Sequence, residues 1–175
     1  MTQRQNVVQA ACFATIATLF SLALACAAPF AALAVVAAQR LAPREALLTL
    51  LLAWLANQAI GYGLLDYPVD ATSIGWGIAL GLAAFAALFA AWAMMRRIPD
   101  RWFALAMGFT AAFIANQAIL YLLGLGLPGG EGAFTWSIIA EVLRSNVLGF
   151  SVLLVVLGIA DAVAVKVSAR NATAR

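Results

Sequence analysis

The amino-acid sequence consists of long apolar runs separated by short segments that carry the charges, prolines and most turn residues. Of its 175 residues, 66% are hydrophobic and only 10% are charged, and the mean hydropathy is +1.01. A water-soluble domain of this length needs more charge than this to cover its surface. Several runs reach the ~20 residues with which a helix crosses a bilayer. The sequence therefore predicts an all-α, polytopic membrane helix bundle that forms a single integral membrane domain over residues 1–175.

The composition argues against several classes of function. The net charge of +3 arises at the ends of the apolar runs and not in a basic patch, so no nucleic-acid partner is expected. Histidine is absent, which argues against most haem, zinc, nickel and copper sites, so we expect neither a metal nor another cofactor. The motifs HExxH, GxSxG and the P-loop are also absent, so no enzyme is expected, and Glu141 is the one residue suited to act as an acid or base.

The apolar runs and their charged ends predict the helices and their direction. We expect six membrane helices, at about residues 7–26, 29–39, 45–65, 73–95, 101–126 and 135–166. The second is short and should tilt or lie partly buried in protein. Pro29 favours the break before it, but five helices, with 7–38 as one kinked span, remain an alternative. A signal peptide ending near "ALACA" is less expected than a retained helix, because the apolar run continues beyond it.

Basic residues cluster at 40–44, 96–101 and 166–175, whereas the loops at 66–72 and 127–134 carry only acidic charges. The positive-inside rule then places both termini in the cytoplasm and the acidic loops outside, in a multi-pass protein of the cell inner (cytoplasmic) membrane. Asp161, near the inner end of the last helix, is expected to snorkel or to pair with Lys166.

The pentapeptide ANQAI occurs twice, at 56–60 and 115–119. A tyrosine follows each copy at the same spacing, and a proline and a tryptophan follow in the same order, at Tyr62 and Tyr121, Pro68 and Pro128, and Trp76 and Trp136. This pattern predicts an internal parallel repeat in which helices 3 and 4 correspond to helices 5 and 6, as repeat units of about 45–95 and 101–166. The two tryptophans are expected to lie in an interfacial aromatic belt.

The repeat places polar side chains inside the predicted membrane spans. Trp54, Gln58 and Tyr62 follow one another at i, i+4 and i+8 and so share one helix face, and the second copy repeats the stripe with Phe113, Gln117 and Tyr121. Amides that face lipid without a partner are costly, so these side chains should face the bundle interior.

The last helix brings further polar side chains to a similar depth, about 9–17 Å from its outer end. Glu141 and Arg144 are three residues apart and can pair, and charges inside a span indicate a functional site. We therefore predict an outward-facing small-molecule site, in which Arg144 holds an acidic group of the ligand. Its predicted residues are Asn57, Gln58, Tyr62, Asn116, Gln117, Tyr121, Glu141, Arg144 and Asn146. The alternative is a set of interhelical hydrogen bonds that only hold the helices together.

Six helices with both ends inside, an outward-facing pocket and an alanine-rich first helix ("ACFATIAT", within residues 10–18) resemble one family. It comprises the substrate-binding S components of energy-coupling-factor vitamin transporters, including the solitary ones. The resemblance covers the whole chain in architecture and rests on common motifs. It implies that the chain captures a vitamin-like molecule or cofactor precursor, and that a transmembrane coupling subunit and an ATPase module dock on helix 1. The alternative function is a non-catalytic membrane subunit that stabilises or assembles a larger complex.

The charge pattern makes a testable prediction about topology. Reporter proteins fused at residues 5 and 173 should both report the cytoplasm, because basic residues retain the ends of the chain there. Reporters in opposite compartments would contradict six helices and favour five.

Overall fold

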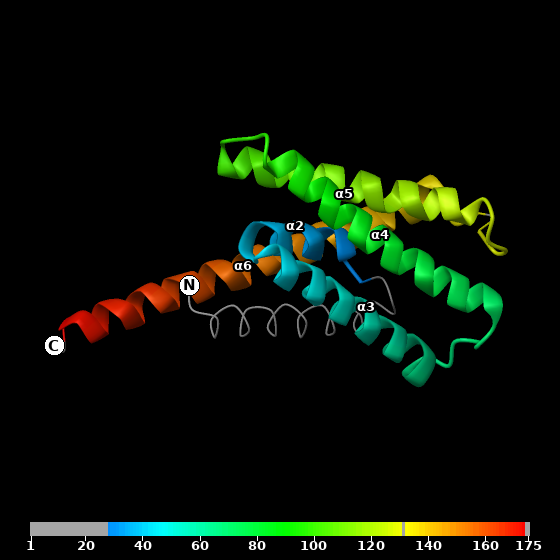
Figure 1. Cartoon of the computed structure of the whole chain (residues 1–175), viewed down its shortest axis with the longest axis horizontal. Coiled ribbons are helices and arrows are strands. Elements are labelled where there is room, and N and C mark those ends of the chain that lie inside the picture. The colour runs from blue at the N-terminus through cyan, green and yellow to red at the C-terminus, as the bar shows by residue number, and fades with distance from the viewer. Residues whose placement is uncertain (1–27, 131, 174–175) are drawn as a thin grey trace.

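The computed structural model describes residues 28–130 and 132–173, which form five helices. In chain order these are α2 (Phe30–Arg40), α3 (Pro43–Leu64), α4 (Ala71–Met95), α5 (Arg101–Gly124) and α6 (Trp136–Thr173) (Figure 1). Apart from the last helix, which runs on to Thr173, the helix ends lie within one turn of those predicted. The helix predicted at 7–26 lies outside the described residues, so the total of six helices stays a prediction.

Four of these helices are long and apolar enough to cross a membrane. They are α3, α4, α5 and the first part of α6, over Pro43–Leu64, Ala71–Met95, Arg101–Gly124 and Trp136–Ala162. Only 28% to 39% of the most apolar stretch of each is buried inside the protein, so most of that surface is left to face an apolar solvent. Together they indicate a multi-pass membrane protein.

The short helix α2 forms the centre of the bundle. Its residues from Phe30 to Ala37 are between 0% and 4% exposed, and α2 contacts α3, α4, α5 and α6 (Figure 1). A helix of 11 residues is about 16 Å long, roughly half of the ~30 Å hydrocarbon core. Its sequence, FAALAVVAAQR, is apolar on every side, as expected for a helix enclosed by other helices. The prediction that this segment lies buried in protein is confirmed.

A helix that begins inside a bundle leaves backbone N–H groups that water cannot reach. In α2 these groups are all bonded. Phe30 N donates to Ala28 O at 2.8 Å, and Leu33 N donates to Pro29 O at 2.9 Å. The two N–H groups between them, of Ala31 and Ala32, donate to Oδ1 of Asn146 on α6, at 3.1 and 3.3 Å. Asn146 therefore caps α2 from another helix.

Two features of α6 allow this cap to form. The amide nitrogen of Asn146 donates to Val142 O at 2.9 Å, which fixes the orientation of the side chain. One turn further on, a Cβ added to Gly149 would lie 2.7 Å from both Cβ and Cγ of Pro29, closer than real Cβ atoms approach. Glycine at this position thus lets the start of α2 lie directly against α6.

The helices that begin at the ends of the bundle are capped locally by acidic side chains. Asp70 accepts from Ser73 N and Asp100 accepts from Phe103 N, both at 2.7 Å, at the starts of α4 and α5. At the start of α3, Glu45 accepts from Ala42 N at 3.1 Å. At these positions a carboxylate loses little hydration, because the positions are exposed or half-buried. The buried start of α2 is instead capped by a neutral amide.

The loops sort to the two ends of the bundle as their charges predicted. Figure 1 shows the connections 65–70 and 125–135 at one end, and the connection 96–100 towards the other. Arg40 closes α2 by pairing with Asp161 on α6, Nη1 lying 2.8 Å from Oδ2. Asp161 thus pairs with Arg40, a contact that helical spacing along α6 does not reveal, because it depends on where the end of α2 meets α6. The expected partner, Lys166, has a side chain that lies outside the part of the chain whose side chains are described, so that pairing stays a prediction.

The internal repeat is not confirmed and stays a prediction. Helix α3 meets α4 through Trp54, whose Nε1 donates to Gly77 O at 2.8 Å. The corresponding residue of the second copy, Phe113, has no N–H in its side chain. Helix α5 meets α6 through a stacked pair, Phe109 and Phe150, with ring centroids 4.9 Å apart. The most extensive helix contact joins α4 to α5, across the predicted boundary between the repeat units.

The cap on α2 predicts the effect of removing it. Asn146→Leu should lower the free energy of unfolding by about 2 kcal/mol or more, because two buried N–H groups lose their acceptor. Denaturation of the purified protein in detergent would measure this loss. Ser145→Ala is the matched control, since Ser145 is an adjacent buried residue whose hydroxyl makes no hydrogen bond within the described residues. Equal losses in the two variants would contradict the cap.

Candidate ligand-binding site

Two neighbouring cavities lie in the half of the bundle that carries the acidic loops. The first, of about 140 Å³, lies between α3 and α4. The second, of about 250 Å³, is enclosed by α2, α4, α5, α6 and the loop that precedes α6. Trp76 and Leu80 of α4 line both, so these two side chains form the wall between the cavities.

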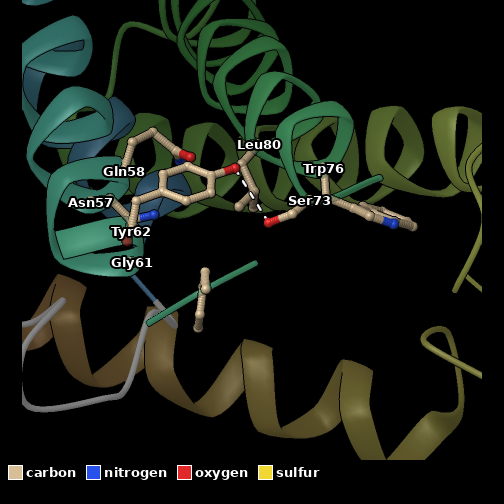
Figure 2. Close-up of a pocket in the computed structure, with 9 residues that line it drawn as sticks. Asn57, Gln58, Gly61, Tyr62, Ser73, Trp76 and Leu80 are labelled. Atoms are coloured by element: carbon tan, nitrogen blue, oxygen red, sulfur yellow. Dashed lines mark hydrogen bonds between the residues drawn. The ribbon is translucent and has the colours of Figure 1, made fainter. Parts of the chain in front are cut away.

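The first cavity contains the polar face predicted on α3. Asn57, Gln58 and Tyr62 line it, and the hydroxyl groups of Tyr62 and Ser73 are hydrogen-bonded at 3.3 Å (Figure 2). Asn57 is 3% exposed, which confirms that this amide faces the interior. The ring of Tyr67 meets that of Tyr62 edge-on, with centroids 6.4 Å apart. This cavity is therefore narrow and bordered by two tyrosines.

Glycines on α4 make room for the stripe on α3. A Cβ added to Gly77 would lie 2.5 Å from Oε1 of Gln58, and one added to Gly81 would lie 3.0 Å from the indole of Trp54. The two glycines are four residues apart, so they lie on the same face of α4. They receive side chains that are themselves four residues apart on α3, which confirms that Trp54 and Gln58 share one face.

The second cavity collects amides from two helices. Asn116 and Gln117 of α5 and Asn146 of α6 line it, and Asn116 is 7% exposed. The remaining lining is mainly apolar and includes the rings of Phe30, Trp76 and Phe134. No charged side chain among the described residues lines either cavity.

Gln117 is the unusual polar group of the second cavity. Its Nε2 atom is buried and has no hydrogen-bond partner in the described part of the chain. A buried donor without an acceptor costs about 1–3 kcal/mol, so such groups are uncommon unless something else binds them. Asn146, by contrast, uses both ends of its amide in bonds to the backbone. Gln117 and Asn146 therefore differ in the hydrogen-bonding groups that they leave available to a ligand.

Trp76 was expected in an interfacial belt, and the structure gives it a more specific place. Its Nε1, on α4, donates to Pro128 O at 3.0 Å, in the connection between α5 and α6. Its ring lies against Gly124 and Gly130, where an added Cβ would come within 3.0 and 3.2 Å of it. The signal in the sequence was the run GLGLPGG, whose glycines admit a large ring. Trp136, in contrast, is 87% exposed, as a belt residue would be.

The other predicted site residues lie outside both cavities. Tyr121 is 50% exposed, and its ring meets that of Phe134 edge-on at 5.3 Å. Glu141 and Arg144 are exposed on α6, and no ion pair joins them within the described residues. The reason is helical phase, because Arg144 and Asn146 are two residues apart and so point in nearly opposite directions, about 200° around the helix.

The structure thus brings together six of the nine predicted residues, three in each cavity. The residues that the sequence did not single out are mainly Ser73, Phe30 and Phe134, whose positions depend on how distant segments meet. Within the described residues, no three cysteine, aspartate or glutamate side chains gather where they could hold a metal ion. Comparison with family models, curated proteins and solved structures finds no match to this chain.

The contacts of Trp76 predict how the loop before α6 is held. Trp76→Phe should raise hydrogen exchange at residues 125–130 about fivefold, because a hydrogen bond and part of the ring contact, together about 1 kcal/mol, are lost. Trp136→Phe is the control, since that ring is almost fully exposed. Equal exchange in the two variants would mean that Trp76 does not hold the loop.

Proposed function

We propose that this membrane protein binds a small uncharged molecule in the cavity between α2, α4, α5 and α6. The observation that carries this proposal is the buried, unpartnered Nε2 of Gln117 in a cavity of about 250 Å³. A ligand oxygen or ring nitrogen bonded to this donor would remove its cost.

The lining supports a neutral ligand with a flat apolar part. Amides offer donors and acceptors without net charge, and three aromatic rings provide apolar walls. No charged side chain of the described residues lines the cavity to balance an ionised ligand, so the acidic group expected beside Arg144 is not part of this proposal. Ligand sites usually have volumes of about 300–1,000 Å³, so the molecule belongs at the small end of that range.

The biological role that we propose is uptake. A pocket at the end of the bundle with the acidic loops, in an inner-membrane protein with both termini in the cytoplasm, would capture its ligand from outside. This is the role of the S components that the chain resembles, and a coupling subunit with an ATPase module would then dock on helix 1. Helix 1 lies outside the described residues, so its alanine-rich face enters this proposal from the sequence alone.

The experiment detects ligand binding as a rise in the thermal stability of the protein. The purified protein is heated with a panel of vitamins and cofactor precursors, charged and uncharged. A ligand at about 100 times its dissociation constant should stabilise the protein by about 2.7 kcal/mol. Stabilisation only by charged members of the panel, or by none, would contradict the proposal.

Gln117→Leu provides the decisive variant. Leucine has a similar volume and no unsatisfied donor, so the empty protein should be as stable as the wild type or more so, while stabilisation by the ligand and uptake should be lost. Gln58→Leu, in the first cavity, is the matched control and should keep most of the ligand's effect. If Gln117→Leu instead unfolds the empty protein and leaves ligand binding intact, the amide is structural.

A second candidate, a subunit that assembles with other membrane proteins, is favoured by one observation. Glu141 and Arg144 are exposed on α6, inside the stretch long enough to cross the membrane. Association through this face does not exclude ligand binding in the cavity, because neither residue lines it.

A further inference from the structure

One face of α6 has no partner among the described residues. Two rows of exposed residues run along it at seven-residue spacing, Glu141, Leu148 and Val155 in one row and Arg144, Ser151 and Gly158 in the other. This is the spacing at which two helices keep contact along a common seam. Of the four membrane-length helices, α6 has the smallest buried share, 28%.

The first reason to expect protein on this face is its charge. Glu141 and Arg144 lie about 8 and 12 Å along α6 from its start at Trp136, within the apolar span. Neither lines either of the two cavities, and neither forms an ion pair with another residue of the described part of the chain. Lipid tails cannot compensate a carboxylate and a guanidinium, so charged side chains in spans usually face other protein.

The second reason is Gly158. A Cβ added there would meet nothing within 4 Å, so no contact with the described residues requires a glycine. Glycine in a helix costs about 1 kcal/mol relative to alanine. Small residues are typical of the places where two membrane helices approach closely. Ser151, one heptad earlier, donates its hydroxyl to Val147 O at 2.8 Å and so leaves no unsatisfied polar group at such a contact.

We propose that this face of α6 binds the same face of a second copy of the chain. All copies of a membrane protein insert in the same direction, so the two-fold axis runs along the membrane normal and the two α6 helices are parallel. Such an interface is self-complementary. Equivalent residues of the two copies then lie at the same height, with Arg144 about 4.5 Å further along the helix than Glu141. Glu141 of each copy can therefore pair with Arg144 of the other, so that two ion pairs compensate all four charges. The proposal does not rest on the ligand-binding function, because none of these residues lines a cavity.

The first test is disulfide cross-linking in native membranes. In a full-length chain with Cys12 and Cys26 replaced by alanine, Leu148→Cys and Val155→Cys should give covalent homodimers on oxidation. Ile114→Cys is the control, because Ile114 is as exposed on α5 as Val155 is on α6, at 61% each. Homodimers from the control alone, no cross-link at all, or cross-links to a different protein or within one chain would each overturn the proposal.

The second test exchanges the charges. Glu141→Arg puts two guanidinium groups on the face, and Arg144→Glu puts two carboxylates there. Each variant alone should form at least about tenfold fewer dimers, since a loss of ~1.4 kcal/mol already gives that factor. When the two variants are co-expressed with different tags, mixed dimers should return to the wild-type yield. If Arg144 only reaches lipid headgroups, the single variants will dimerise normally and mixing will have no effect, which overturns the proposal.

The third test separates association from folding. Gly158→Leu should reduce dimerisation by a similar factor while leaving the melting temperature of the monomer in detergent unchanged, because no described residue lies within 4 Å of a Cβ at that position. Gly63→Leu is matched to it, since a Cβ at Gly63 on α3 also meets nothing within 4 Å. Loss of dimers in both variants, or in neither, would count against the α6 seam.

Discussion

The buried start of α2 is the constraint on which the rest of this bundle depends. Half a membrane span, enclosed on all sides, exposes N–H groups where neither water nor lipid can accept a hydrogen bond. A carboxylate would satisfy them but would itself be buried, with an ionic cost that a neutral amide avoids. Asn146 supplies that amide from α6, and Gly149 lets Pro29 come close enough for the bonds to form. The position of α6 is thereby fixed relative to the centre of the fold.

This solution also produces the larger cavity. Because α2 begins half-way through the bundle, its first residue, Phe30, lines the cavity. The loop before α6 closes the other side, where Trp76 is held on glycines and bonded to Pro128. The cap and the ligand site therefore share Asn146, which serves the backbone. Gln117 lies in the same cavity, and its Nε2 has no acceptor among the described residues. In the proposed function, Asn146 thus serves the fold and Gln117 serves the ligand.

The helices were largely predictable from the sequence because their determinants are local. Asp70 and Asp100 precede the runs that they cap, and the apolar lengths match a bilayer. The interior position of Asn57 and Asn116 could be predicted because an amide that faces lipid without a hydrogen-bond partner is energetically costly. What the sequence could not reveal were contacts between distant segments. Asn146 and the N–H groups that it caps are more than 100 residues apart, and Trp76 reaches a loop that follows the next helix. The exposure of Glu141 and Arg144 has a related reason, since their depth along α6 was predictable but the rotation of α6 is set by the cap.

That rotation links the inside of the protein to its outside. Once Asn146 points at α2, residues two and five positions earlier on α6 point away from it, at about 200° and 140° in helical phase. The face that carries Glu141 and Arg144 is thus turned outward by the same bond that closes the interior. The hydrocarbon core of a membrane cannot compensate these two charges. The described residues of one chain include no further helix that covers them. The bond that buries the neutral amide of Asn146 therefore also exposes the charges of Glu141 and Arg144. Their exposure gives the proposed association through α6 a physical reason.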